Sequence, residues 1–211
     1  MVDHAPGERI YQGAEAVLTA ALFLGRSAVL KQRTPKAYRL PALEHQISRG
    51  RMRNEARLMR RARAAGVGVP ALFDAEPESQ SLVLEYLGRS SLRNEYDSLS
   101  SAGRKNAARA VGEAIGQLHG ASIIHGDLTT SNMILRGGRV HFLDFSLGHI
   151  SDKAEDRAVD LKAFKDSFVA THLAHATDLS VVFDGYAKSL GPAGQKVIKQ
   201  IASIERRRRY A

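Results

Sequence analysis

Ile-Ile-His-Gly-Asp-Leu-Thr-Thr-Ser-Asn-Met-Ile-Leu (123–135), followed by Arg-Gly-Gly-Arg (136–139) and Val-His-Phe-Leu-Asp-Phe-Ser (140–146), is the stretch that decides the fold. Three polar residues flank its short apolar segments: Asp127, Asn132 five positions later, and Asp144 after another twelve. The Gly137-Gly138 pair is typical of a tight hairpin turn, which would fold the strand after Asn132 back beside the strand that delivers Asp144. The spacing therefore predicts that these three side chains meet in one cleft.

This layout is typical of phosphoryl transfer in the protein-kinase superfamily. In that chemistry the first Asp orients the attacking hydroxyl or accepts its proton, so Asp127 is the predicted catalytic residue. Asn132 and Asp144 are the predicted ligands of the Mg²⁺ ions that neutralise the ATP phosphates. A single Asp near Thr and Ser is more often a turn or helix-cap residue. The joint pattern favours the kinase-like interpretation.

Composition bounds the class of protein. The chain has 211 residues with 44% hydrophobic content, enough for a real core in one domain or two small lobes. It has no cysteine, which excludes disulfides and thiolate metal sites. No apolar run approaches the roughly 18 residues of a membrane span, and the first residues lack the apolar core of a signal peptide. We therefore expect a cytoplasmic protein with no membrane partner.

Positive charge is the second strong signal, with a formal net charge of +9 and a pI near 10.0. Such a charge can serve solubility alone, or it can serve a polyanionic partner such as RNA. The basic residues concentrate in two places, between Lys31 and Arg63 and in the run Arg206 to Arg209. Clusters of this kind are expected where a protein binds phosphate backbones. The prediction is tRNA or other RNA contact through a basic helix and the C-terminal arginines.

The first thirty residues read as a three-strand meander with turns at Gly13 and Gly25. Gln12, Gly13 and Ala14 stand where a kinase has its glycine-rich phosphate loop, but only one of the usual glycines is present. Lys31 ends an apolar strand, where an inward-facing ammonium could reach the ATP phosphates. Alone, it would read as an edge-strand lysine that keeps its charge in water.

A basic helix is predicted over 43–65, with Gly66 as its C-terminal stop. Glu55 is the single acid of its central turns. It could pair with arginines on the helix surface. In a kinase-like lobe, the same helix presents a Glu that holds the ATP-contacting lysine, so Lys31 and Glu55 form a testable pair.

Two further strands, 71–74 and 81–88, should lead to a hinge at Glu85, Tyr86 and Leu87, whose backbone would bind the adenine edge. A core helix that ends near Gly120 and a helix over 155–172 follow. Asp160, in the second of these, could brace the catalytic loop or be a solvated helix residue. The predicted fold is α+β, a small bilobal protein-kinase-like fold. Residues 1–84 form an N-lobe of antiparallel sheet with one main helix, 85–88 the hinge, 89–205 a mostly helical C-lobe, and 206–211 a basic tail.

Beyond the general kinase pattern, the chain resembles the small atypical kinase/ATPase subunit of the KEOPS (EKC) complex, in archaeal form. The segments that carry the resemblance are 31–43, 53–58, 125–132 and 155–161, and it covers nearly the whole chain. It implies ATP and Mg²⁺ as cofactors, Ser/Thr kinase activity in isolation, and ATP hydrolysis in the complex. It also implies a threonylcarbamoyl-transferase subunit and other KEOPS subunits as partners, a role in forming N6-threonylcarbamoyladenosine at position 37 of tRNA, and a C-terminal tail associated with tRNA.

Several residues depart from ordinary protein kinases. Gly126 replaces the arginine that receives an activation-loop phosphate, and Thr129 replaces a lysine that stabilises the transferring phosphate. The segment 146–160 is short and lacks Ala-Pro-Glu, which predicts weak phosphorylation of proteins. Ser146 also replaces the glycine of Asp-Phe-Gly, a departure from the KEOPS pattern itself.

Three alternatives remain open at this stage. A small-molecule phosphotransferase of the aminoglycoside or choline type shares His-Gly-Asp but usually has a much larger C-lobe. A RIO-like protein kinase is nearer in size but does not account for the segment 31–43. A scaffold that binds nucleotide and tRNA without turnover would have no need of Asp127, Asn132 and Asp144 together.

Overall fold

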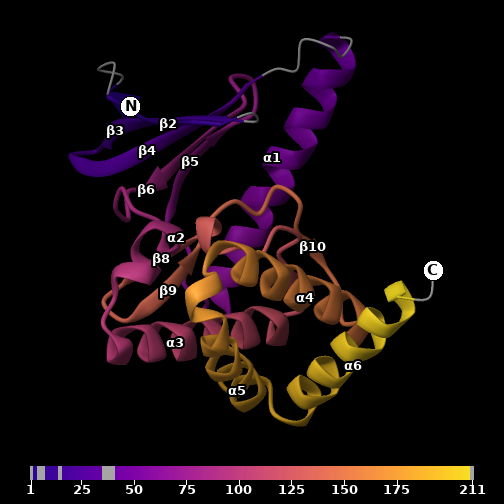
Figure 1. The fold of residues 1–211 in the computed structure, drawn as a ribbon. Coiled ribbons are helices and arrows are strands. Elements are labelled where there is room, and N and C mark those ends of the chain that lie inside the picture. Colours follow the sequence, from indigo (N-terminus) through magenta and orange to yellow (C-terminus); the bar gives the residue numbers. More distant parts are fainter. Residues whose placement is uncertain (1, 4–7, 14–15, 35–40, 210–211) are drawn as a thin grey trace.

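A computed structural model of the chain describes residues 2–3, 8–13, 16–34 and 41–209 (Figure 1). Side chains are described for 8–13, 16–34 and 44–205. The predicted residue Ala14 lies outside the described residues, as does most of the 31–43 segment after residue 34. Figure 1 shows a strand-rich N-terminal part above a mostly helical C-terminal part, with one long helix running between them.

Within the described residues, six antiparallel strands form the N-terminal sheet, in the order β1-β3-β4-β6-β5 with β2 also on β3. They are β1 (Val2–Asp3), β2 (Arg9–Gln12), β3 (Ala16–Phe23), β4 (Arg26–Arg33), β5 (Leu72–Glu76) and β6 (Ser81–Glu85). A two-residue turn joins β3 to β4, and Leu24 (φ 49°) and Gly25 (φ 76°) both adopt positive φ there, as a turn that matches the strand twist requires. The meander was predicted from the sequence, whereas β1 was not.

The long helix α1 (Pro41–Ala64) lies between β4 and β5 in the chain and joins the two parts of the molecule. Met52 and Ala56 pack with Leu82 of the sheet. Further along, Leu58, Met59 and Ala62 belong to the core of the helical part. The helix stops before Gly66, whose positive φ of 79° ends it. One amphipathic element therefore fixes the sheet to the rest of the chain.

The C-terminal part contains the helices that were expected and two small sheets. Its elements are α2 (Leu92–Glu95), the 3-10 turn η1 (Tyr96–Ser98), α3 (Ser101–Gly120), β7 (Ile123–Ile124), η2 (Thr130–Asn132), β8 (Met133–Arg136), β9 (Arg139–Phe142), β10 (His149–Ile150), α4 (Ala154–Thr171), η3 (Leu173–Asp178), α5 (Leu179–Leu190) and α6 (Pro192–Arg209). The β8–β9 hairpin turns at Gly137 (φ 58°) and Gly138 (φ 76°). The other pair is β7 with β10.

The core of this part is dominated by fully buried aromatic and aliphatic side chains, among them Ile115, Leu118, Phe142, Phe145 and Phe164. Glycines let α3 and α5 approach closely: a Cβ atom at Gly112 would overlap the carbonyl oxygen of Val182, and one at Gly185 would come within 2.7 Å of the carbonyl oxygen of Arg109. The predicted α+β, bilobal kinase-like architecture is confirmed.

The stretch predicted as a tail, 206–211, is helical in α6 as far as Arg209. Among the described residues, none of the helices has the length and apolar character needed to cross a membrane.

Candidate functional site

Asp127 and Asn132 lie on the loop between β7 and β8 and are hydrogen-bonded to each other. The Asn132 side-chain nitrogen donates to the Asp127 carbonyl oxygen at 2.9 Å and to its carboxylate Oδ2 at 2.8 Å. Since both amide hydrogens are used, the Asn132 Oδ1 atom is left to accept a cation. The loop thus presents one carboxylate and one amide oxygen toward the same place.

The β8–β9 hairpin brings Asp144 to this loop. The Leu143 amide donates to the Asn132 carbonyl at 2.9 Å, which sets the residue directly before Asp144 against the loop. Asp144 has a positive φ of 56°, and its Oδ1 accepts from the Ser146 amide at 3.1 Å. The three residues separated in sequence by five and twelve positions are therefore adjacent in space.

The His125 ring connects the segment of Asp127 to the segment of Asp144. Its Nε2 lies 2.9 Å from the Leu143 carbonyl, and its Nδ1 lies 3.3 Å from the Asp127 amide. These partners require Nε2 to donate and Nδ1 to accept, which is the neutral form of the ring. Burial lowers the pKa of His125, which keeps the ring in that form. His125 is therefore a positioning residue for both Asp127 and Asp144.

Lys31 of β4 meets both a carboxylate of α1 and the carboxylate of Asp144. Its Nζ lies 2.6 Å from Glu55 Oε1 and 3.0 Å from Asp144 Oδ1. Lys31 and Glu55 are both buried, with Glu55 only 1% exposed. Burial lowers the pKa of Lys31, but Glu55 and Asp144 raise it by more than burial lowers it. The pKa is therefore raised overall, and the ammonium stays charged. The ion pair expected between Lys31 and Glu55 is present, and it reaches the predicted metal ligand.

Asp144 is held in its ionised form by the same contacts. Burial would raise its pKa, but the charge of Lys31 and the hydrogen bond from Ser146 outweigh this and bring the pKa to about 2.

A second cation, Arg33, was not predicted as a site residue from the sequence. It lies two residues beyond Lys31 on the same strand face. Its Nη2 is 3.8 Å from Glu55 Oε2. The period of two in a strand could have pointed to it.

The predicted hinge lies at the end of β6. The Tyr86 amide donates to the Ser27 carbonyl at 3.3 Å, and the Glu85 amide donates to the Ala71 carbonyl at 2.8 Å. The structure shows no such bond for the Leu87 amide among the described residues. The Leu87 amide is thus a backbone donor directly after β6, in the segment predicted to be the hinge.

The predicted phosphate loop is the turn between β2 and β3. The Gly13 amide donates to the Ala16 carbonyl at 3.0 Å, and the Gln12 side chain accepts from Arg9 at 2.6 Å. Gly13 has its closest neighbour in its own strand, because a Cβ there would lie 2.8 Å from the Tyr11 ring. For the part of this turn that the structure describes, Gln12 and Gly13 have no hydrogen bond to Asp127, Asn132 or Asp144, and the role of the turn stays a prediction.

Asp160 of α4 holds the backbone of the loop 125–132, the predicted catalytic loop. It is 2% exposed, and its two oxygens accept from the amides of His125 and Gly126, each at 2.9 Å. The His119 ring donates to it at 3.2 Å and is oriented in turn by the Tyr186 hydroxyl at 2.9 Å. Of the two possibilities open for Asp160, bracing the loop is the correct one. The supporting residues His119 and Tyr186 were not predicted, because their helices read simply as core.

A second buried support reaches the loop at Thr130. The Thr130 hydroxyl lies 3.0 Å from His172 Nε2, and His172 Nδ1 lies 2.6 Å from Asp97 Oδ1. Nothing in the sequence signalled this contact, because the three residues come from separate segments.

Gly126 lets the segment after Asp144 pack against the catalytic loop. Its φ is 81°, and a Cβ atom there would overlap the carbonyl oxygen of Leu147. An arginine at this position would need both a strained backbone and a displaced neighbour. The absence of a receptor for an activation-loop phosphate is therefore built into the backbone.

The donor set fits Mg²⁺ bound together with nucleotide phosphates. Asp144 and Asn132 offer hard oxygen ligands, and Mg²⁺ typically binds one or two carboxylates and completes its shell with phosphates and water. In the described part of the chain, no group of three or more His, Cys, Asp or Glu residues that could hold a metal ion occurs.

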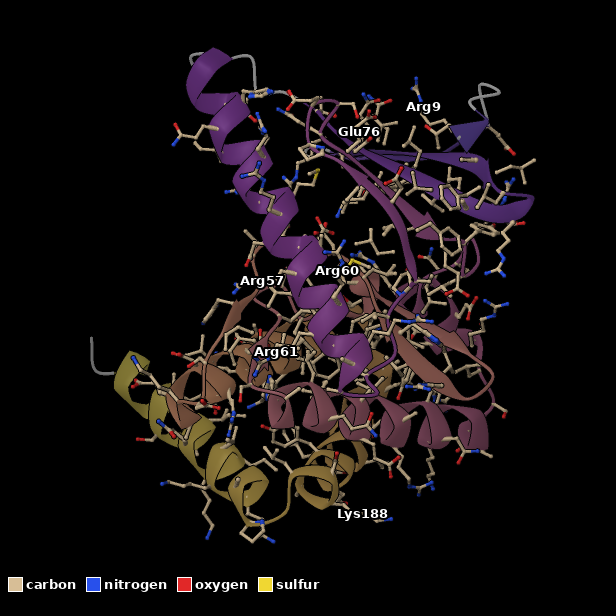
Figure 2. All side chains as sticks on the ribbon, turned by 180° about the vertical axis from the view of Figure 1, so that it is seen from behind. Arg9, Arg57, Arg60, Arg61, Glu76 and Lys188 are labelled. Atoms are coloured by element: carbon tan, nitrogen blue, oxygen red, sulfur yellow. The ribbon has the colours of Figure 1, made fainter. Side chains whose placement is uncertain are left out.

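The predicted basic helix is α1, and Figure 2 shows Arg57, Arg60 and Arg61 along it. Arg57 bonds Asn54, and Arg61 donates to the Ala121 carbonyl at 3.1 Å. Arg60 is exposed. The side chains of the arginines at 206–209 lie outside the described ones. The structure thus gives an exposed basic face on α1.

Comparison with known proteins gives a consistent result. The model of the lipopolysaccharide kinase (Kdo/WaaP) family matches residues 24–186. The KEOPS complex subunit Bud32 of Pyrococcus abyssi is 37% identical over 209 residues, which is 95% of this chain and 95% of that protein. The EKC/KEOPS complex subunit Tp53rkb of Mus musculus is 35% identical over 96% of this chain and 86% of that protein.

A longer relative also matches. The probable bifunctional tRNA threonylcarbamoyladenosine biosynthesis protein of Methanothermobacter thermautotrophicus is 41% identical over 94% of this chain, which spans 36% of that protein's length. The family match includes Lys31, Glu55, Asp127, Asn132 and Asp144. The chain belongs to the kinase-like Kdo/WaaP family and to the family of the KEOPS complex subunit Bud32.

Proposed function

We propose that the chain is an ATP- and Mg²⁺-dependent atypical serine/threonine kinase and ATPase that serves as a KEOPS subunit in the formation of tRNA N6-threonylcarbamoyladenosine. The observation that carries the proposal is the convergence of Lys31, Asp144, Asn132 and Asp127. Lys31 contacts Asp144, Asn132 contacts Asp127, and the Leu143 amide, one residue before Asp144, donates to the Asn132 carbonyl. Residues 1–84 would act as the N-lobe, 85–88 as the hinge, 89–205 as the C-lobe and 206–211 as the basic tail.

The residues have distinct roles in this proposal. Backbone groups of Glu85, Tyr86 and Leu87 bind adenine, and Lys31, held by Glu55, binds the phosphates. Asp144 and Asn132 would hold magnesium, which neutralises phosphate charge when it is bound. Asp127 accepts the proton of the attacking oxygen. Gln12, Gly13 and Ala14 would cover the phosphates from the β2–β3 turn.

The acceptor oxygen comes from water or from a protein hydroxyl. The position of Gly126 against Leu147 supports a site that needs no loop phosphorylation. The short segment after Asp144 offers little platform for a peptide, which supports ATP hydrolysis as the main reaction.

The names of the relatives support the partners that we propose for this chain. One relative is named for tRNA threonylcarbamoyladenosine biosynthesis and two as KEOPS subunits. We assign this chain a threonylcarbamoyl-transferase subunit and other KEOPS subunits as partners, tRNA as an RNA partner through α1 and the C-terminal arginines, and a cytoplasmic location.

The test measures ATP binding with and without Mg²⁺, and then ATP hydrolysis with and without the threonylcarbamoyl-transferase subunit. We expect Mg²⁺-dependent binding by the chain alone and faster hydrolysis with the partner. Asp127→Asn is the control for turnover by a contaminating enzyme. Binding of ATP without hydrolysis in either state would instead identify a nucleotide-binding scaffold, and a pull-down from native cells without the transferase subunit would contradict the KEOPS assignment.

A further inference from the structure

A cavity of about 310 Å³ lies beside the predicted hinge, whose residues Glu85 and Tyr86 form one of its walls. Lys31, Asp127, Asn132 and Asp144 do not line it. Its walls come from both parts of the molecule and include Arg26 of β4, Arg63 of α1, Phe73 of β5, Glu85 and Tyr86 at the hinge, and Arg136 of β8. Apart from the hinge assignment of Glu85 and Tyr86, neither the sequence patterns nor the proposed reaction gives this cavity a role.

The charge of the cavity is positive, because three guanidinium groups face one carboxylate. Glu85 is already engaged: its Oε2 accepts from the Ala71 amide at 3.0 Å, and its Oε1 lies 3.6 Å from Arg136 Nη1. Arg63 gives one N–H to the Val69 carbonyl at 3.5 Å, and Arg26 is exposed. One carboxylate cannot neutralise three guanidinium groups, so the cavity favours an anion.

Further basic side chains lie next to the cavity. Burial is the main cause that lowers the pKa of His141 on β9; the charges of Arg139 and Arg136 lower it as well, and that of Glu85 raises it. Arg139 continues the basic surface, since its side chain donates to the Gly66 carbonyl just beyond the end of α1. Arg60 lies one helical turn before Arg63 and is exposed. Cations therefore extend from the cavity along one path.

The size and the aromatic walls narrow the class of anion. A volume of about 310 Å³ is at the small end for ligand pockets, which begin at about 300 Å³. Phe73 is held in place by stacking on Phe23, with ring centroids 5.4 Å apart, and Tyr86 lines the cavity too. Aromatic rings beside guanidinium groups are the groups that bind an unpaired nucleotide, by stacking on its base and pairing with its phosphate.

We propose that this cavity binds one nucleotide of a single-stranded RNA segment. Its phosphate pairs with Arg26, Arg63 and Arg136, its base lies against Phe73 and Tyr86, and the neighbouring phosphates follow Arg60 and Arg139. An acidic peptide matches the guanidinium groups but leaves the aromatic walls without a partner. The proposal rests on the proposed function only in taking RNA as a partner. It uses the side chain of Tyr86, whereas the proposed adenine contact uses the backbone of the hinge.

The test compares two double variants of the full chain. The pocket variant carries Arg26→Ala and Arg136→Ala. The control variant carries Arg109→Ala and Lys188→Ala, which removes the same charge from exposed residues of α3 and α5. Figure 2 shows Lys188 near the lower edge of the molecule, below Arg57, Arg60 and Arg61 of α1. Fluorescence anisotropy measures binding of a labelled eight-nucleotide oligouridine, a duplex RNA of equal length and a poly-glutamate peptide over a range of salt.

We expect the pocket variant to lose at least about fivefold in affinity for the oligouridine, and its log–log salt slope to fall by about 0.7, since Arg26 and Arg136 share one phosphate and each phosphate contact on a single strand contributes about 0.7. The control variant should lose less than twofold. Phe73→Leu should weaken oligouridine binding without a change in salt slope, because it removes stacking and no charge. ATP binding should be unchanged in all three variants, which separates this result from a failure of the proposed reaction.

Two results would overturn the proposal. One is an equal loss for the pocket and control variants, which would assign the affinity to overall charge. The other is a loss confined to poly-glutamate, or shared equally by duplex RNA, which would assign the cavity to an acidic protein segment or to a general phosphate surface. Thermal unfolding of each variant verifies that the fold is retained.

Discussion

At the scale of single residues, Lys31 and Asp144 stabilise each other's charged forms. Lys31 keeps its proton because two carboxylates lie within 3.0 Å of its nitrogen. Asp144 loses its proton because the same lysine is beside it. Asp127 differs, since its partner is the neutral amide of Asn132. Among the described contacts, no cation pairs with Asp127, the residue predicted to accept a proton.

The two aspartates should therefore fail in different ways. Asp127→Asn should lower ATP turnover by about 10²-fold or more and leave ATP affinity within about twofold, because the residue acts on the attacking oxygen. Asp144→Asn should also abolish the dependence of ATP binding on Mg²⁺. Isothermal titration with and without Mg²⁺, together with hydrolysis rates, separates the two. Full turnover by Asp127→Asn in the assembled complex would remove its assigned role.

Lys31 and Glu55 should behave as one unit. Lys31→Ala and Glu55→Ala should each lower turnover by about 10²-fold, and the double variant should be no slower than the slower single variant, because each residue acts through the pair. Hydrolysis rates of all four proteins complete the cycle. Thermal unfolding is the control, since Glu55 is buried. Losses that add up would show that the two residues act independently.

At the scale of elements, the site depends on a helix that contributes no reacting group. Asp160 on α4 accepts hydrogen bonds from two backbone amides of the catalytic loop. Its own position is fixed by a hydrogen bond from His119 of α3. The loop is thereby tied to the helical core through backbone groups, which a change of side chain in the loop itself would not disturb.

Asp160→Asn should cost about 2–4 kcal/mol of unfolding free energy, because the amide replaces an acceptor with a donor facing buried N–H groups. Asp166→Asn, on the same helix but exposed and paired with Lys162, is the matched control and should cost less than about 0.5 kcal/mol. Denaturant titration measures both. At a temperature where Asp160→Asn is folded, its kcat should fall more than its KM rises. Equal stability of the two variants would make Asp160 a solvated helix residue after all.

Elements with a local signal were predictable from the sequence, and contacts between distant elements were not. The hairpin at Gly137 and Gly138 and the helix that ends before Gly66 follow from turn and stop residues, and the structure has them where expected. The pairing of β1 with β3 involves only two residues and has no periodicity to reveal it. Asp97, Thr130 and His172 come together only because three separate segments fold, so no local pattern could indicate their contact.

At the scale of the whole molecule, the excess of positive charge is unevenly distributed. The basic residues are concentrated on α1, around the cavity beside the hinge, and at the end of α6. The residue Glu205 pairs with Lys165 of α4 at 2.6 Å and fixes α6 to the helical core just before the arginines. The arginine run thus starts from a defined point on the molecule.

Removing the charge of that run should change RNA binding alone. Replacement of Arg206, Arg207, Arg208 and Arg209 by Gln should weaken binding of a tRNA transcript and lower its log–log salt slope by about 2–4, since each phosphate neutralised contributes about 0.7–0.9. ATP hydrolysis without tRNA should stay near that of the unmodified chain, because Glu205 and its ion pair are kept. Filter binding over a range of salt measures the slope. An unchanged slope would assign the arginines to solubility or to a protein partner.

The contact between Gly126 and Leu147 restricts the changes that such a chain can accept during evolution. Acquiring an arginine at residue 126 requires a strained backbone and a displaced carbonyl before any phosphate can be received. The loop after Asp144 would have to lengthen and move in the same step, and neither change is useful without the other. Control by covalent modification of this loop is therefore hard to gain by single mutations, and selection is left to act on the surfaces through which the chain meets its partners.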